Sequence, residues 1–253
     1  MRKSPDKADS GNNTAENVTL EKIKIRSSTE LTNIQKFVAA RMIKSQSIPQ
    51  LLQTVRADTT SLLSLKEKIK QDVLSSRGIS ISYTDFLIKI CSSALKEYIE
   101  LNSSYSNDKY IIYDDINIGL AISVNNDLIV GTLYNADKLE ISEIAKKRME
   151  LVRKAETNTL SMADVKYSTF TITNVGMYGI RSTYALINPP QAAILAAGEI
   201  YTEPAIVDGK VLPRSFIEVS LSVDHRIING ALSAKFLSRI AYFIEKPEIL
   251  FQK

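Results

Sequence analysis

Residues 216–246 of this 253-residue chain read FIEVSLSVDHRIINGALSAKFLSRIAYFIEK, and the spacing of the apolar residues changes halfway along. Up to Val223, apolar and polar residues alternate, which is typical of a strand with one buried face. From Ala231 the apolar residues recur every three or four positions, which predicts an amphipathic helix. The turn between these two elements, residues 224–230, contains His225, the only histidine of the sequence.

The same two patterns alternate along the rest of the chain. They predict helices over 32–46, 61–74, 82–102, 140–156 and 231–246, and strands over 50–58, 109–113, 116–124, 128–133, 168–174, 192–200 and 216–223. A turn at Asn125-Asn126-Asp127 joins two of the strands in a hairpin. Mixed helices and strands with a hairpin predict an α/β (α+β) sandwich with a mixed, largely antiparallel sheet, rather than a doubly wound Rossmann sheet.

Composition and charge limit the classes of protein that need to be considered. Residues 1–19 are polar and predict a disordered tail or the stub of a linker, so we expect the folded domain to span 20–253. With 44% apolar and 24% charged residues, the chain has an ordinary globular composition. The net charge of +4 is spread along the sequence, and its densest runs lie within a helical pattern. We therefore expect no nucleic-acid partner.

Cysteine content and hydropathy bear on the cellular location. The single cysteine, Cys91, lies on the apolar face of a predicted helix, which favours a small core residue in a reducing compartment. The N-terminus lacks the apolar core of a signal peptide, and no apolar run approaches the roughly 18 residues of a membrane span. We expect a cytoplasmic protein without a membrane partner. The sequence also has no cluster of histidines and cysteines, so no metal is expected.

His225 is the first candidate for catalysis, because histidine can take and return a proton near neutral pH. A lone histidine at the end of a strand is nonetheless more often structural than catalytic. Thr171 and Thr173 share one face of a predicted strand and offer hydroxyl donors, although β-propensity alone also explains them. Asn229, four residues after His225, can orient a loop but cannot act as a base.

Longer stretches of sequence carry a resemblance to a known family. The stretch LSVDHRIINGALSAKFLSRIAYFIEKPEIL (221–250) resembles the C-terminal signature of the dihydrolipoamide acyltransferases, the core components of 2-oxo acid dehydrogenase complexes. Residues 37–63, 128–145, 168–180 and 187–200 resemble further blocks of that family in the same order. The resemblance covers about residues 25–253, and it implies the fold of chloramphenicol acetyltransferase.

The resemblance also implies a reaction and an assembly. His225 takes the position of the general base that removes a thiol proton, and Thr173 takes that of the oxyanion donor. The implied substrates are coenzyme A and dihydrolipoamide, with the lipoyl group supplied by another protein or domain and no metal involved. The implied assembly is a homotrimer with sites at subunit interfaces, which can form a larger cage and bind a lipoyl-bearing protein and the dehydrogenase components.

One position departs from the family signature and leaves two alternatives open. Asn229 stands where the family has an aspartate that pairs with an arginine, and Arg41 is the candidate for that arginine. An arginine without its carboxylate costs stability when it is buried. The departure favours a non-catalytic trimeric scaffold that organises dehydrogenase components. A free-standing acetyltransferase for a small hydroxyl substrate is a third reading.

Overall fold

The computed structural model describes residues 24–124 and 127–251, so the tail expected at 1–19 lies outside the described residues. The chain divides into a short unit that ends at Phe37 and a large unit from Val38 to Lys253. In the short unit, Thr32 and Gln35 exchange side-chain to backbone hydrogen bonds and cap the start of α1 (Asn33–Gln46). The rest of α1, from Val38, and all the other helices and strands described lie in the large unit.

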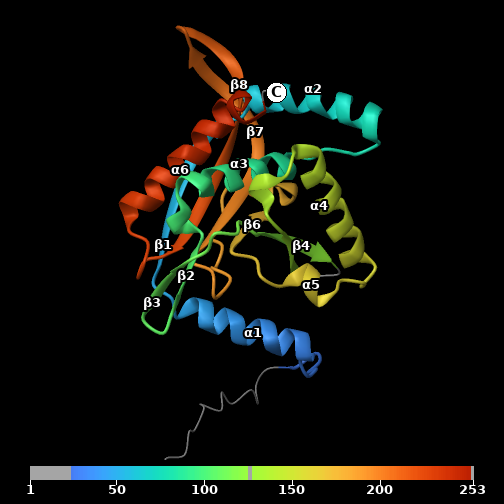
Figure 1. Cartoon of the computed structure of the whole chain (residues 1–253), viewed down its shortest axis with the longest axis vertical. Helices are drawn as coiled ribbons and strands as arrows, with labels where there is room; N and C mark the ends of the chain where they lie inside the picture. Colours follow the sequence, from blue (N-terminus) through green and yellow to red (C-terminus); the bar gives the residue numbers. More distant parts are fainter. Residues whose placement is uncertain (1–23, 125–126, 252–253) are drawn as a thin grey trace, which may run out of the picture. The chain divides into compact units, whose positions relative to one another are not determined.

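A six-stranded sheet forms the centre of the large unit (Figure 1). In spatial order it contains β1 (Gln50–Asp58), β8 (Lys210–Asp224), β7 (Ala193–Val207), β6 (Phe170–Asn174), β4 (Ile118–Val124) and β5 (Asp127–Leu133). Strand β6 runs parallel to β4 and β7, and the other neighbours are antiparallel. The predicted mixed, largely antiparallel sheet and the hairpin of β4 and β5 are confirmed.

Helices α2 (Thr60–Arg77), α3 (Tyr83–Glu97), α4 (Ile141–Glu156) and α6 (Gly230–Glu245) supply the helical layer of the large unit. Helix α3 is the most deeply embedded, because Phe86, Leu87, Ile88 and Ile90 are all fully buried. Cys91 is also buried there as a free thiol, and burial raises the pKa of that thiol. The helix predicted over 82–102 is too long: α3 ends at Glu97, and the short η2 (Ile99–Leu101) turns the chain into β2 (Ser103–Ser106).

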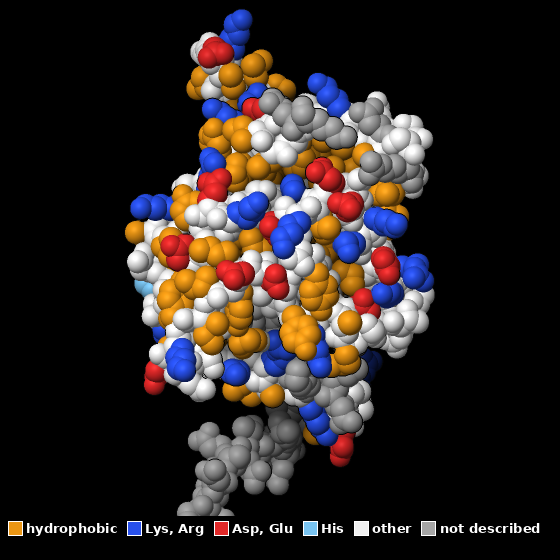
Figure 2. All heavy atoms as spheres, viewed as in Figure 1, with side chains coloured by type: hydrophobic (Ala, Val, Ile, Leu, Met, Phe, Trp, Pro, Cys, Tyr) orange, Lys and Arg blue, Asp and Glu red, His pale blue; other side chains and the backbone are white. Residues whose placement is uncertain are grey.

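Strands β7 and β8 are much longer than their predicted lengths. Each has 15 residues, and their distal halves form a hairpin that projects from the sheet (Figure 1). Its turn places Asp208 at φ 51° and Gly209 at φ 76°, the left-handed values that a tight two-residue turn requires. Ile206, Val211 and Leu212 are exposed, and apolar side chains gather on this hairpin at the top of Figure 2.

A second, two-stranded sheet lies beside the end of β8. It pairs β2 with β3 (Lys109–Ile112) around a turn in which Asn107 and Asp108 have φ 50° and 57°. The Ala192 N–H donates to the Ser103 carbonyl (2.9 Å), and the Asp224 N–H donates to the Ala192 carbonyl (2.8 Å). The base of the small sheet is thereby linked to the end of β8 through a single residue.

A buried ion pair joins α3 to α4. The Asp85 carboxylate is inaccessible to solvent and accepts from Arg148 Nε at 2.7 Å. The same carboxylate accepts from the backbone N–H and the hydroxyl of Ser82, which caps α3. Burial of this carboxylate is tolerated because every polar partner that it needs is in place.

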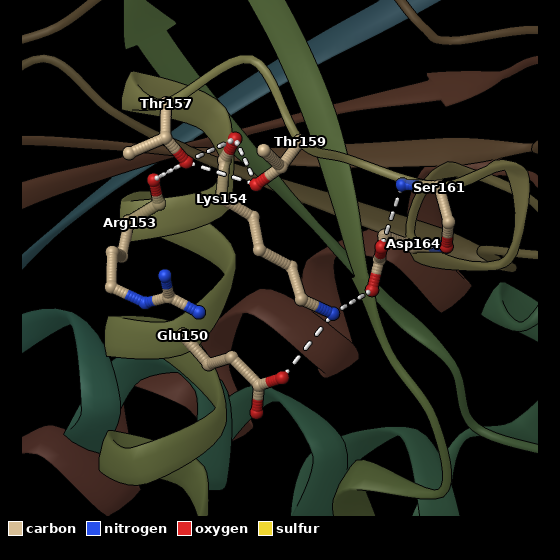
Figure 3. A network of polar contacts seen from close by, with 7 residues as sticks. All are labelled: Glu150, Arg153, Lys154, Thr157, Thr159, Ser161 and Asp164. Carbon is tan, nitrogen blue, oxygen red and sulfur yellow. Dashed lines mark hydrogen bonds and ion pairs between the residues drawn. The ribbon is translucent and has the colours of Figure 1, made fainter.

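A polar network fixes the end of α4 to the short α5 (Met162–Val165), as Figure 3 shows. Lys154 Nζ donates to Asp164 Oδ1 at 2.9 Å, and the Ser161 backbone N–H donates to Asp164 Oδ2 at 2.8 Å. The hydrogen bonds from Ser161 and then Lys154 lower the pKa of Asp164 to about 2. The Asp164 carboxylate therefore completes the N-terminal cap of α5 and binds Lys154 at the end of α4.

We predict that Asp164→Asn destabilises the protein by about 1 kcal/mol at neutral pH, a modest loss because solvent screens a pair at the surface. The folded pKa of about 2 is below the ordinary value of 3.8, so the stabilisation is complete above about pH 4 and is lost as the pH falls through 2. Urea unfolding followed by circular dichroism at pH 7 and pH 2 measures this.

The control is Glu150→Gln, which removes the exposed carboxylate 3.2 Å from Lys154 and leaves Asp164 in place. It should change the unfolding free energy less than Asp164→Asn does. An Asp164→Asn variant as destabilised at pH 2 as at pH 7 would contradict the assigned role of the charge.

Candidate active site

His225 lies in the turn between β8 and α6, where its side chain is exposed. Its backbone N–H donates to the Pro49 carbonyl at 2.9 Å, which ties the turn to the residue before β1. Its Nδ1 lies 3.1 Å from the Ile228 carbonyl oxygen. Since a carbonyl oxygen only accepts, Nδ1 carries the hydrogen of the neutral ring. The lone pair then resides on Nε2, which is the nitrogen available to take a proton.

An ion pair holds the two residues that flank His225. The Asp224 carboxylate, 2% exposed, accepts from Arg226 Nε at 2.9 Å and from Arg226 Nη2 at 2.6 Å. It also accepts from the backbone N–H of Arg226 at 3.1 Å. The hydrogen bonds to Asp224 raise the pKa of Arg226. Because the pair spans His225, it fixes the backbone on both sides of the imidazole.

Asn229 has a structural task that the sequence analysis missed. Its Oδ1 accepts from the Leu232 N–H at 2.9 Å and caps α6. A helical turn would place residue 229 beside His225, but the backbone of Asn229 is extended, with φ −80° and ψ 165°. Within the described chain, no hydrogen bond joins Asn229 to His225. A cap signature, Asn directly before an apolar helical pattern, was the signal available in the sequence.

Arg41 is not the partner of Asn229. Its guanidinium donates to Asn188 Oδ1 at 2.7 Å and to the Pro189 carbonyl. Partial burial lowers the pKa of Arg41. The proposed pair of Arg41 with Asn229 is therefore wrong for the folded chain, because Arg41 bonds to the segment that leads into β7.

The two threonines of β6 have different surroundings. Thr171 is buried, and its hydroxyl donates to Gln191 Oε1 at 2.6 Å, so this hydroxyl is committed to the fold. Thr173 is half-buried, and its hydroxyl makes no hydrogen bond with any described residue. Of the two, Thr173 is the one whose hydroxyl remains free for a substrate.

Within one chain, Thr173 and His225 are far apart. Thr173 lies beside Ala196, Ala196 lies beside Ser220, and His225 follows Ser220 by five residues. At about 3.3 Å per residue and about 4.8 Å between strands, their Cα atoms are roughly 19 Å apart. At that separation, the side chains of Thr173 and His225 do not meet within one chain.

Other features of the surface add no catalytic group. The depressions found on either side of α6 contain neither His225 nor Thr173. In the described part of the chain, no group of His, Cys, Asp and Glu has the geometry to hold a metal ion. None of the helices described is long and apolar enough to cross a membrane.

We predict that Asn229→Ala lowers the free energy of unfolding by about 1 kcal/mol, because an orphan N–H at the start of α6 loses its acceptor. Asn229→Asp keeps an oxygen at the same place and adds a negative charge near the positive end of the helix, so it should be at least as stable as wild type. Urea denaturation of the two variants measures this. Equal losses in both would mean that the cap contributes nothing.

A family model supplies the first comparison. The model described as 2-oxoacid dehydrogenases acyltransferase (catalytic domain) matches residues 24–252. Among curated proteins, the dihydrolipoyllysine-residue acetyltransferase component of the pyruvate dehydrogenase complex from Rickettsia felis is 32% identical over 219 residues. That alignment covers 86% of this chain and 53% of the relative, so the chain spans about half the length of the curated protein.

Solved structures give the same picture. A probable dihydrolipoamide acetyltransferase from Listeria monocytogenes has a TM-score of 0.84 at 37% identity, covering 87% of this chain and 94% of that one. The cubic core of a pyruvate dehydrogenase multienzyme complex has a TM-score of 0.86 at 27% identity, covering 92% and 97%. Chloramphenicol acetyltransferase, with a TM-score of 0.52 at 14% identity over 81% and 94%, shares the fold alone, as predicted.

A third similar structure concerns mechanism. It is dihydrolipoamide acetyltransferase from Azotobacter vinelandii, with a TM-score of 0.86 at 27% identity over 92% of this chain and 97% of that one. The structure belongs to an investigation of the role of a serine, a histidine and an asparagine in the catalytic mechanism of that enzyme. There the serine precedes the histidine by 52 positions, and the asparagine follows it by four.

Proposed function

Because this chain belongs to the 2-oxoacid dehydrogenase acyltransferases (catalytic domain), we propose that it transfers an acyl group between coenzyme A and the thiol of dihydrolipoamide. The observation that carries the proposal is the state of His225, an exposed imidazole whose Nδ1 is held by the Ile228 carbonyl. In its neutral form, such a ring presents the lone pair of Nε2 to a substrate thiol. A scaffold has no use for that arrangement.

The proposed reaction begins with proton removal. Nε2 of His225 takes the proton of the substrate thiol as its sulfur attacks the thioester carbonyl of the partner substrate. A free thiol has a pKa near 8.5 and is mostly protonated at neutral pH, so a base at this point accelerates the attack. A new carbon–sulfur bond forms, the old one breaks, and the departing thiolate recovers the proton from the imidazolium. Nothing is oxidised or reduced, and the same groups run the reaction in reverse.

Thr173 is the proposed oxyanion donor. The attack places negative charge on the carbonyl oxygen, and a hydroxyl aimed at that oxygen contributes about 3 kcal/mol to the transition state. The free hydroxyl of Thr173 supports this role, whereas that of Thr171 is already bonded to Gln191. The interval from Thr173 to His225 equals the 52-position interval of the Azotobacter serine and histidine.

Asn229 also fits the proposal. It follows His225 by four positions, the same interval as the Azotobacter histidine and asparagine. An asparagine at this place therefore does not argue against catalysis. In this chain its contact with Leu232 gives it a positioning role at the start of α6, behind the turn that carries His225.

The distance between Thr173 and His225 supports a site shared by two copies of the chain. We propose a homotrimer in which His225 of one copy faces Thr173 of the next, and a larger cage like the similar cubic core. The lipoyl group would come from another domain or protein, and the dehydrogenase components would be the partners. No residue is assigned to coenzyme A. A buried, unpaired Cys91 supports a reducing, cytoplasmic location.

We predict that the purified protein transfers acetyl or larger acyl groups from acyl-coenzyme A to dihydrolipoamide, and that His225→Ala lowers kcat by about 10²- to 10⁴-fold through loss of the base. Thr173→Val should lower kcat by about 10²- to 10³-fold, and Thr173→Ser should retain activity as the control that keeps the hydroxyl. A thiol-release assay with several acyl donors measures both effects.

The same assay decides against the alternative of a non-catalytic scaffold. A wild-type protein that assembles but turns over none of the acyl donors would overturn the enzyme proposal and favour the scaffold. Transfer to a small hydroxyl acceptor in place of dihydrolipoamide would favour a free-standing acetyltransferase.

We predict that co-expressed His225→Ala and Thr173→Val chains recover activity that neither variant has alone. With random mixing in a trimer, about a quarter of the shared sites receive an intact histidine and an intact threonine, so about a quarter of wild-type kcat should return. Mixing the separately assembled variants without exchange of subunits is the control. Co-expressed activity equal to the mean of the two single variants would place both groups in one chain or remove Thr173 from the site.

A further inference from the structure

We propose that Tyr105 is a positioning residue for His225, an inference that rests on the function proposed above. Its ring supports the guanidinium of Arg226, and that contact holds the turn from which the imidazole projects. Tyr105 comes from the small β2–β3 sheet, 120 positions before His225 in the sequence. Nothing in the sequence around the histidine indicates such a contact.

The Arg226 side chain is held from two directions. Its Cζ lies 4.2 Å from the centroid of the Tyr105 ring, close enough for the attraction of a cation to an aromatic face. Asp224 grips the same guanidinium with both carboxylate oxygens, at 2.9 and 2.6 Å. Without the ring, the guanidinium keeps its bonds to Asp224 but loses its contact with the small sheet. The turn is then no longer linked to that sheet through the side chain of Arg226.

The small sheet is a firm base for this contact. The Ala192 N–H donates to the Ser103 carbonyl, and the Asp224 N–H donates to the Ala192 carbonyl, so β2 and the start of the turn share a backbone frame. Tyr105 lies two residues after Ser103 on the same strand. The hydroxyl of Tyr105 donates to Asp108 in the hairpin turn, away from the face that meets Arg226. The backbone of β2 thereby holds the Tyr105 ring in position against the Arg226 guanidinium.

The β2–β3 hairpin gains little stability from burial of its outer strand. Tyr110, Ile111 and Ile112 of β3 are all exposed, so the outer strand buries little apolar surface. His225 itself is exposed and has one hydrogen bond to its ring, from Nδ1 to the Ile228 carbonyl. The direction of Nε2 therefore depends on the backbone of residues 224–226. A displacement of about 1 Å at a reacting group can cost about 10²-fold in rate.

The test compares Tyr105→Leu with Tyr105→Phe, which keeps the aromatic face. Tyr110→Leu is the matched control, because it removes a tyrosine from the same hairpin, and Tyr110 bonds to the Glu100 carbonyl rather than to Arg226. For each variant we would measure kcat, KM for coenzyme A, and the rate at which diethyl pyrocarbonate modifies His225. As His225 is the only histidine, ultraviolet absorbance of the modified imidazole reports on this residue alone.

We expect kcat of Tyr105→Leu to fall about ten- to a hundredfold, with KM for coenzyme A changed less than about twofold. The modification rate should fall, because a loosened turn weakens the hydrogen bond that Nδ1 donates to the Ile228 carbonyl, and that bond raises the basicity of the reacting Nε2. Tyr105→Phe and Tyr110→Leu should keep wild-type values of both. Arg226→Lys keeps the charge near Asp224 but loses the flat face over the ring, so it should behave like Tyr105→Leu.

The proposal is overturned if folded Tyr105→Leu and Arg226→Lys keep wild-type kcat and modification rate. It is also overturned if kcat falls while the modification rate stays unchanged, because the effect then does not act through His225. If Tyr105→Leu fails to fold, Arg226→Lys decides between these outcomes. A wild-type protein without acyltransferase activity removes the proposed function, yet the modification rates still decide whether Tyr105 positions the imidazole.

Discussion

The register of β8 is the constraint on which the rest of the structure depends. This strand pairs antiparallel with β1 along its inner half and with β7 along almost its whole length, and Val219, Leu221 and Val223 are completely buried. Side chains alternate between the faces of a strand, so a slip by one residue would put the buried polar row of Ser220, Ser222 and Asp224 where this apolar row packs. The register also determines that the strand ends at Asp224, and therefore that His225 lies in the turn directly after it.

The same register separates the two proposed catalytic groups. Thr173 is aligned through Ala196 with Ser220, in the middle of β8, whereas His225 lies past the end of that strand. No side-chain rotation bridges roughly 19 Å, because strand spacing and rise are set by the backbone. The proposed site would therefore need two copies of the chain, and a change to this pairing would alter the separation of the two proposed groups.

Much of the fold was predictable because its elements have clear periodicity, and the errors have physical causes. The extension of β7 and β8 was missed because Pro204 and Pro213 normally exclude a strand, but here they face each other in a two-stranded hairpin beyond the sheet. Strand β2, four residues of Ser-Ser-Tyr-Ser, is too short and polar for periodicity to detect. The surroundings of the site were less predictable than its residues, since the contacts of Arg41 and Tyr105 depend on segments distant in sequence.

Asn229 shows what an amide does at a position where the sequence analysis expected an aspartate. An aspartate at this place would be expected to balance an arginine, and its loss would leave a buried charge without a partner. In this chain the guanidinium of Arg41 donates to the oxygens of Asn188 and Pro189. What remains at residue 229 is the need for an oxygen that accepts from the start of α6. An amide oxygen accepts this hydrogen bond as a carboxylate oxygen would, so the asparagine keeps the helix cap without the charge.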